Sequence, residues 1–266
     1  MLGAIIGDIV GSRFEFDNFL NKKFDLFVSD CTFTDDTVCT IAVMEWLMAC
    51  KKEGAPLDFT KYLHSWCRRY PNRGYGLNFL GWINSNNPQP YNSFGNGSAM
   101  RVSPIGFFFD NEIDVLNYAE FSSIVSHNHK EGVKGAQAIA LAIFLARNGY
   151  SKEEIANRIS SDFKYDLTQT CLYIRIHNHF DETCQVTVPQ AIIAFLESEN
   201  FEDAIRNAIS IGGDSDTIAA MTGGIAEAFY GRINDKIVRR AIKFIPQEML
   251  AVLKSFYSMV NLRYNY

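Results

Sequence analysis

The chain has 266 residues, and its 30 acidic residues outnumber its 25 basic ones, which gives a formal net charge of −5. This mild acidity argues against a nucleic-acid-binding protein, because such proteins usually carry a basic patch that releases counterions from phosphate. A chain of this length buries a sizeable core without disulfides. The six cysteines are therefore expected to be reduced and packed, as in a cytoplasmic protein.

No segment is expected to enter a membrane. The longest unbroken apolar run, residues 138–146, is far shorter than the roughly 20 residues that a spanning helix needs. The apolar N-terminus lacks a basic n-region and contains Asp8, so it does not fit a signal peptide. We expect a cytoplasmic monomer without nucleic-acid or membrane partners.

Hydrophobic spacing predicts helices along almost the whole chain. Residues 2–10 repeat apolar side chains at three- and four-residue spacing, as one face of a buried helix does. Further helices are predicted at 38–47, at 133–147 before Asn148-Gly149, from the capping box Ser151–Glu154, from Thr187 with Pro189 in its first turn, at 201–209 after Asn200, at 218–230 before Gly231, and from Pro246 to about 260.

Strand signals are weak, and residues 24–33 form the one stretch that could be extended. The stretch 84–97, rich in Asn, Pro and Gly, is predicted to be a loop, and its length suggests a function. No linker or repeat is visible. We therefore predict one all-α domain over residues 1–266, a single compact multi-helix unit.

The first acidic motif, Phe33-Thr34-Asp35-Asp36-Thr37, comes just before the predicted helix 38–47. Capping by Thr34, with a carboxylate at the positive end of the helix, explains one acidic residue. Two adjacent carboxylates repel each other, which makes a bound cation plausible.

The second acidic motif, Gly212-Gly213-Asp214-Ser215-Asp216-Thr217, precedes the predicted helix 218–230. In a regular helix Asp214 and Asp216 would point about 200° apart, so they converge only in an irregular lead-in, which the two glycines permit. Capping by Ser215 or Thr217 is the alternative interpretation.

Together the two motifs offer hydroxyl and carboxylate oxygens without histidine or cysteine. Such ligands suit Mg²⁺, Mn²⁺ or Ca²⁺ rather than zinc. Two divalent ions would neutralise the four carboxylates, and a pair of ions roughly 3.5–4 Å apart is a recurring hydrolytic device. The two motifs thus predict a dinuclear metal cleft.

Five segments, in this order along the chain, resemble motifs of the ADP-ribosylglycohydrolase family. That family includes the dinitrogenase reductase-activating glycohydrolase and the ADP-ribosylarginine and ADP-ribosylserine hydrolases. The five segments are Gly3–Phe16, Phe33–Thr37, Gly95–Arg101, Ser126-His127 and Gly212–Thr217. The resemblance implies an all-α fold with a dinuclear Mg²⁺ or Mn²⁺ centre.

The resemblance also implies roles for single residues. The implied metal ligands are Thr34, Asp35, Asp36, Asp214, Asp216 and Thr217. The implied substrate-binding residues are Asn96, Gly97, Ser98, Met100, Arg101 and His127. Glu15, Asp35 and Asp36 are the implied catalytic carboxylates, of which Glu15 could act as a base or hold a water molecule.

Some of these residues also have plain physical interpretations. Asn96-Gly97-Ser98 is predicted to open a helix whose free amides suit a diphosphate, although an ordinary Gly/Ser cap explains the same pattern. Arg101 would face a phosphate or simply a carboxylate. Four aromatic residues flank the long loop, and one of them could stack on adenine: Tyr75, Phe79, Tyr91 and Phe94.

Two positions depart from the family pattern. Ser215 stands where the family more often has Thr, and little effect is expected because it lies between the implied ligands. Glu227 stands where a small residue is commoner, which could alter helix packing.

The resemblance implies a metal-dependent hydrolase that removes ADP-ribose from an arginine- or serine-type side chain, or from a related small conjugate. The bond cleaved would be the glycosidic bond at C1 of the distal ribose. The alternatives are a non-catalytic ADP-ribose-binding module and a di-metal hydrolase of another small nucleotide. The intact acidic motifs disfavour the binding module.

Overall fold

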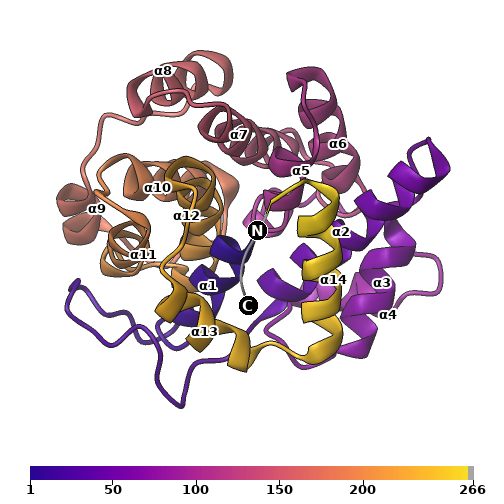
Figure 1. Cartoon of the computed structure of the whole chain (residues 1–266), viewed down its shortest axis with the longest axis horizontal. Helices are drawn as coiled ribbons and strands as arrows, with labels where there is room; N and C mark the ends of the chain where they lie inside the picture. The colour runs from indigo at the N-terminus through magenta and orange to yellow at the C-terminus, as the bar shows by residue number, and fades with distance from the viewer. Residues whose placement is uncertain (263–266) are drawn as a thin grey trace.

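A computed structural model describes residues 1–262 (Figure 1), in which the backbone is helical and forms no strand. The one β-type contact in these residues is an isolated bridge between Gly95 and Thr183. The predicted all-α class is therefore confirmed. The helices are α1 (Leu2–Gly11), α2 (Asp35–Glu53), α3 (Phe59–Arg69), α4 (Leu77–Asn84), α5 (Ser103–Phe108), α6 (Glu112–Ile124), α7 (Lys130–Arg147), α8 (Lys152–Phe163), α9 (Cys171–His177), α10 (Cys184–Leu196), α11 (Phe201–Ser210), α12 (Ser215–Tyr230), α13 (Asp235–Ala241) and α14 (Gln247–Met259), with 3-10 turns η1 (Asn96–Ser98) and η2 (Ile242–Phe244).

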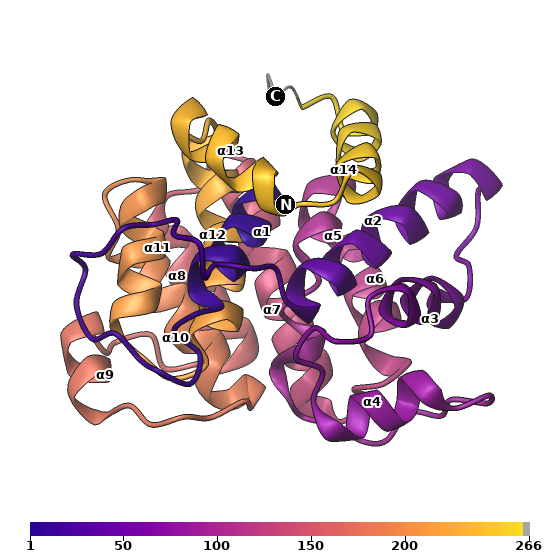
Figure 2. The same ribbon diagram turned by 90° about the horizontal axis from the view of Figure 1, so that it is seen from below.

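Helix α1 occupies the middle of the molecule, with α9 to α13 on one side and α2 to α4 on the other (Figures 1 and 2). Helix α7 also lies in the central region and packs against α5, α6 and α12. Helix α14 returns to pack against α2. One continuous cluster of buried apolar side chains joins all these elements into a single compact domain.

Helices α1 and α12 pack so closely that glycines are required between them. A Cβ atom built on Gly3 would lie 2.2 Å from the carbonyl oxygen of Gly223, and one on Gly11 would lie 2.4 Å from Cα of Asp216. Both distances are shorter than any side chain tolerates. This packing presses the end of α1 against the second acidic motif.

Glu227 of α12 strengthens the same contact. Its carboxylate accepts a hydrogen bond from the amide of Gly3 at 2.7 Å and further bonds from the amino group of Met1 and the hydroxyl of Tyr257. The side chain is buried. The expected influence of Glu227 on helix packing therefore takes the form of a polar tie between α1, α12 and α14.

Except at Asn96, the predicted helices are present, and several of their caps are confirmed. The capping box at Ser151 and Glu154 is present, Asn200 caps α11, and α12 ends at Gly231. Helices α3, α4, α6, α9 and α13 had no predicted counterpart, because they are short or mostly half-exposed and their apolar repeats are brief.

Five predicted helix starts are wrong. The helices expected from 38, 133 and 218 each begin three residues earlier, at Asp35, Lys130 and Ser215. The helix expected from Thr187 likewise begins at Cys184, after the N-cap Thr183, so Pro189 lies inside it.

The helix expected at Asn96 is only the single turn η1, and the next α-helix begins at Ser103. The bridge between Gly95 and Thr183 fixes the loop at this point, where tertiary contacts override the local helix signal.

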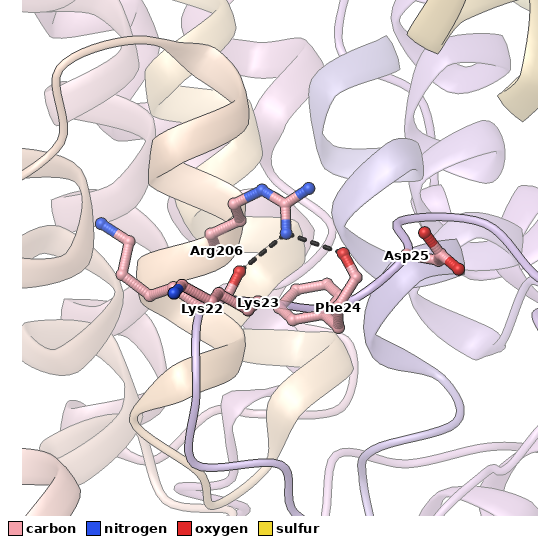
Figure 3. Close-up of a pocket in the computed structure, with 5 residues that line it drawn as sticks. All are labelled: Lys22, Lys23, Phe24, Asp25 and Arg206. Atoms are coloured by element: carbon pink, nitrogen blue, oxygen red, sulfur yellow. Dashed lines mark hydrogen bonds between the residues drawn. The ribbon is translucent and has the colours of Figure 1, made fainter.

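The long segment 12–34 crosses the surface between α1 and α2. It forms no strand, so residues 24–33, the one stretch that could have been extended, belong to no sheet. Figure 3 shows how α11 holds this segment: Arg206 donates to the carbonyl oxygens of Lys22 at 2.7 Å and Phe24 at 2.8 Å. Its other nitrogens pair with Glu202. All three guanidinium nitrogens of Arg206 thus bond to protein groups. The surface hollow in Figure 3 is therefore a point where α11 holds the segment that carries Glu15.

All six cysteines are free and buried, as the composition predicted. None of the helices found in residues 1–262 combines the length and the apolar character needed to cross a membrane.

Candidate active site

One cavity of about 550 Å³ gathers most of the predicted functional residues. Its walls come from the segment after α1, the starts of α2 and α12, helix α4, and the loop around η1. The predicted residues that line it are Glu15, Asp35, Asp36, Asn96, Gly97, Met100, Arg101, His127, Asp214, Asp216 and Thr217. Thr34 and Ser98 stand next to lining residues without lining the cavity themselves.

The start of α2 is held by a carboxylate from α1. Asp8 accepts hydrogen bonds from the amide of Thr34 at 3.0 Å, from its hydroxyl at 2.7 Å, and from the amide of Thr37 at 3.1 Å. The hydroxyl of Thr37 donates to the same carboxylate. Because Asp8 satisfies the helix N-terminus, the carboxylates of Asp35 and Asp36 are left for the cavity.

The start of α12 has a different local structure. Gly212 and Gly213 both have positive φ, at 74° and 78°, which confirms the predicted tight lead-in. Asp214 is the N-cap residue but makes no capping hydrogen bond, and its Oδ2 accepts from the Asn96 amide at 2.6 Å. The alternative of simple capping by Ser215 or Thr217 is therefore wrong for this helix.

One hydrogen bond joins the two acidic motifs, and Glu15 lies beside the second of them. The Thr217 hydroxyl donates to Oδ2 of Asp36 at 3.1 Å, which links the start of α12 to the start of α2. Glu15, Asp214 and Asp216 offer carboxylate oxygens that all lie within 4.8 Å of one another. Glu15 thus joins the group of possible metal ligands, a position that its sequence context alone did not indicate.

Burial and mutual repulsion raise the pKa values of these carboxyls in the bare protein. Burial is the larger cause and the neighbouring carboxylates the next: the pKa of Glu15 is raised to about 8, and those of Asp35, Asp36 and Asp216 are raised well above their ordinary range. The pKa of Asp214 is raised by burial to about 7, although a hydrogen bond from Asn96 opposes the shift. No lysine or arginine in residues 1–262 forms an ion pair with them.

The donor set fits divalent cations that prefer oxygen. Oδ1 of Asp36 is buried and has no hydrogen-bond partner in the described part of the chain, so one strong acceptor is left for a ligand. The cavity offers carboxylate and hydroxyl oxygens with no thiolate, which is the chemistry of Mg²⁺ or Mn²⁺. This acidic cluster could hold a metal.

The loop around η1 adjoins the acidic cluster, because the side-chain amide of Asn96 donates to Asp214. The backbone N–H of Asn96 donates to the carbonyl oxygen of Glu182 at 2.7 Å, and the Ser98 hydroxyl donates to the carbonyl oxygen of Gly132 at 2.8 Å. A Cβ atom on Gly97 would lie 2.9 Å from Nε2 of His127, so only glycine fits there. Backbone amides and the histidine ring therefore share one wall.

His127 and Arg101 differ in their access to the cavity. The His127 ring lies 6.4 Å from the Phe79 ring and 5.8 Å from the Tyr91 ring, both of which line the cavity. The Arg101 side chain is wholly buried and bonds to Ser122 and Ser126, not to a carboxylate. Of the two expected partners, a carboxylate is not found among the contacts of Arg101 within residues 1–262, and a phosphate stays a prediction.

Three of the four aromatic candidates line the cavity: Tyr75, Phe79 and Tyr91. Phe94 does not, and packs on His129 with ring centroids 5.4 Å apart. Phe16, exposed at the rim, pairs instead with Phe180 at 5.7 Å.

Sequence reasoning missed three residues that shape the site. Asp8 is the one charged residue of the otherwise apolar α1, and a charge inside such a helix is itself a signal, since an isolated buried charge is costly. Asn18 exchanges hydrogen bonds with Gly213, at 2.8 and 2.9 Å, and Glu182 lines the cavity. No local pattern marks these two, because both act through contacts far apart in sequence.

Comparisons with known proteins agree with this geometry. The family model for ADP-ribosylglycohydrolase matches residues 1–254. The chain belongs to the ADP-ribosylglycohydrolase family. Its members are glycohydrolases, so the chain is an enzyme of that type.

Curated relatives support the assignment at moderate identity. The chain is 29% identical to the ADP-ribosylhydrolase ARH3 of Gallus gallus, covering 87% of this chain and 84% of that protein. It is 27% identical to the ADP-ribosylarginine hydrolase Tri1 of Pseudomonas putida (strain GB-1), covering 87% of this chain and 69% of that one. A solved structure titled "ADP-ribosylglycohydrolase-related protein complex" shares the fold, with a TM-score of 0.71, 24% identity, and coverage of 97% of this chain and 95% of that chain.

Proposed function

We propose that this glycohydrolase removes ADP-ribose from an arginine- or serine-type side chain, or from a related ADP-ribose conjugate, by metal-dependent cleavage of the bond at C1 of the distal ribose. The observation that carries the proposal is the single cavity in which buried carboxylates face the η1 loop and His127. The names of relatives that act on ADP-ribosylated substrates support the substrate class.

The proposed metal ligands are the residues of the two acidic motifs. They are Thr34, Asp35, Asp36, Asp214, Asp216 and Thr217. Two bound Mg²⁺ or Mn²⁺ ions would supply Lewis-acid polarisation and orientation of oxygen ligands at this site. The Thr34 hydroxyl donates a hydrogen bond to Asp8, so its oxygen would ligate a metal ion while its proton stays bonded to Asp8.

The chain's own groups have distinct tasks in this mechanism. Glu15, with Asp35 and Asp36 beside it, orients and activates the attacking water as a general base. Its pKa is raised to about 8 in the bare protein by burial and neighbouring carboxylates, and bound cations would lower it again, which favours the carboxylate form that a base requires. The transition state at C1 has oxocarbenium character, as in other glycoside cleavage, and the surrounding carboxylates favour positive charge there.

The η1 loop and His127 position the substrate in this mechanism. The amides of Gly97 and Ser98 face the diphosphate, while Asn96, Met100 and His127 contact the sugar side of the ligand. Holding both ends of ADP-ribose fixes C1 next to the activated water, which is a proximity effect. The free, buried cysteines are consistent with a cytoplasmic enzyme, and we propose that it acts as a monomer.

A substrate panel tests the proposal. Peptides ADP-ribosylated on Arg or on Ser, and small ADP-ribose conjugates, are incubated with Mg²⁺, Mn²⁺ or excess chelator, and free ADP-ribose is measured by chromatography. Release with either metal and none with chelator is expected, and the preferred acceptor identifies the linkage. Full activity in chelator contradicts metal dependence, and release of phosphate instead of ADP-ribose indicates a hydrolase of another nucleotide.

A further inference from the structure

A chain of hydrogen bonds leads from the interior to the cavity wall. Nη2 of Arg101 lies 3.0 Å from the Ser126 hydroxyl, and that hydroxyl lies 2.8 Å from Nδ1 of His127. Arg101 and Ser126 are wholly buried, and the His127 side chain is 5% exposed where it lines the cavity. Arg101 is thus linked to the His127 ring through Ser126, the residue that precedes the histidine.

The direction of these hydrogen bonds follows from donor chemistry. A guanidinium group can only donate, so the oxygen of Ser126 accepts from Arg101. The hydroxyl proton of Ser126 is then directed to its other neighbour, Nδ1 of His127. Within residues 1–262 Nδ1 is the one acceptor at hydrogen-bond distance from this buried hydroxyl, so an Nδ1–H would leave the hydroxyl proton without a partner. We therefore assign Nδ1 as the acceptor, which leaves the single ring proton of a neutral imidazole on Nε2.

The environment keeps the imidazole neutral. Burial, and next the nearby Arg101 cation, lower the pKa of His127 well below its ordinary value. The ring is held in place as well, because the backbone amide of His127 donates to Ser123 at 2.8 Å and the Ser123 hydroxyl donates back to the His127 carbonyl oxygen at 2.8 Å.

The opposite ring nitrogen is directed at the η1 loop. Nε2 would lie 2.9 Å from a Cβ atom on Gly97, so the missing side chain is what opens the space in front of it. Within residues 1–262 Nε2 has no hydrogen-bond partner, whereas Nδ1 has one. Its N–H is therefore available to a ligand in the cavity.

Arg101 borders the cavity, but its side chain has no exposed surface. Its Nε and Nη1 atoms are buried without a hydrogen-bond partner in the described part of the chain, and its guanidinium lies 5.6 Å from the centre of the Phe59 ring. Its Nη2 is used by the Ser122 carbonyl oxygen at 2.7 Å and by Ser126. Within residues 1–262 the hydrogen-bonded path from Arg101 to the exposed part of the cavity wall runs through Ser126 to His127.

We propose that Arg101 is a positioning residue that, through Ser126, fixes His127 as the Nε2–H tautomer, so that His127 presents a hydrogen-bond donor to an oxygen atom of the substrate. The proposal rests on the proposed function for the nature of that substrate. It replaces the substrate-binding role implied for Arg101 by a positioning role, and it specifies the substrate-binding role implied for His127 as that of a neutral hydrogen-bond donor.

Nitrogen NMR of protein carrying ¹⁵N-labelled histidine tests the tautomer directly. The ring of His127 is assigned by its absence in His127→Gln, and at neutral pH we expect a protonated Nε2 and an unprotonated Nδ1. Ser126→Ala should shift the ring towards the other tautomer, whereas Ser122→Ala should not, because Arg101 bonds only the backbone oxygen of Ser122. A protonated Nδ1 in the wild type, or no change in Ser126→Ala, overturns the proposal.

Binding of ADP-ribose gives the second measurement. We expect His127→Ala to weaken binding roughly tenfold, the effect of one lost hydrogen bond. His127→Gln, which keeps an N–H donor, should retain most of the affinity, and equal losses in both variants contradict the donor role. If Ser126→Ala does not fold, the wild-type tautomer decides.

The NMR result does not depend on turnover, so the two proposals can fail separately. The expected tautomer in a protein that releases no ADP-ribose refutes only the proposed function. ADP-ribose release by a protein with the opposite tautomer refutes only the relay.

Discussion

At the start of α2 a carboxylate from another helix caps the backbone, whereas at the start of α12 glycines and asparagines shape it. Asp8 accepts the amides and hydroxyls of Thr34 and Thr37 in the buried core. At α12, Asn18 pairs with the backbone of Gly213 and Asn96 holds Asp214. In both places other groups satisfy the local polar needs, so the acidic side chains reach the cavity.

The difference concerns what each region depends on. The α2 start relies on a buried charge and its hydrogen bonds, whose loss exposes unsatisfied groups in the core. The α12 start relies on backbone geometry and on two neutral side-chain amides, that of the exposed Asn18 and that of the buried Asn96. Substitution of Asp8, which holds the α2 start, should therefore affect folding, and substitutions in the lead-in to α12 should mainly affect placement of the carboxylates.

The largest expected effect is on catalysis. Asp35→Asn and Asp216→Asn each remove one carboxylate charge from the cavity, and each should lower the rate of ADP-ribose release by at least about 100-fold, because metal ions supply several kcal/mol at such sites. The exposed Glu153, in the first turn of α8, provides a control in Glu153→Gln. Full activity in both Asn variants would refute the metal site.

The same variants should not lose stability in chelator. Burial and neighbouring carboxylates raise the pKa of Asp35 and Asp216, so removing one charge relieves repulsion in the bare protein. Thermal unfolding should show an equal or higher Tm than the wild type without metal, and a smaller gain on adding Mg²⁺. A lower Tm would mean that the carboxylates stabilise the fold without a cation.

The next effect concerns Asp8. Asp8→Asn places an amide donor against the donors of Thr34 or Thr37, and we expect a loss of about 3 kcal/mol in the free energy of unfolding. Asp58, the exposed N-cap of α3, accepts only the Thr60 amide, so Asp58→Asn should cost less than about 1 kcal/mol. Equal losses measured by urea unfolding would contradict the distinction between a buried and an exposed cap.

These regions also show how far the sequence is informative. The motifs at Asp35 and Asp214 could be found because a pair of acids before an apolar helix is a local pattern. The sequence could not show which carboxylates lie close together. Glu15 lies near Asp216 because Arg206 of α11 holds the segment after α1, and Asn18 of that segment bonds to Gly213. The buried position of Arg101 could not be predicted for the same reason. Its partners are Ser122 in α6 and Ser126 in the turn after that helix.

Stability without metal should depend on pH. The pKa of Asp214 is raised from 3.8 to about 7 by burial, so the folded state binds a proton that the unfolded state has released between these values. Stability is then greatest at low pH within this window and falls as pH rises towards 7. In chelator, the Tm should fall by several degrees from pH 5 to pH 8, and saturating Mg²⁺ should flatten the curve. A Tm in chelator that rises over this range contradicts the assignment.

The smallest effect is expected at Asn18. Asn18→Ala removes the two hydrogen bonds to Gly213, and because the side chain is exposed the loss should be about 1 kcal/mol, roughly 2–4 °C in Tm. Asn21→Ala, in the same segment, loses only a local bond to the Lys23 amide and serves as the control. The informative measurement is the Mg²⁺ concentration for half-maximal ADP-ribose release, which should rise in Asn18→Ala alone, since Asn18 holds the lead-in that places Asp214 and Asp216. An unchanged Mg²⁺ requirement together with a large loss of stability would contradict this. It would show that Asn18, like Asp8 at the α2 start, contributes mainly to folding and not to placement of the carboxylates.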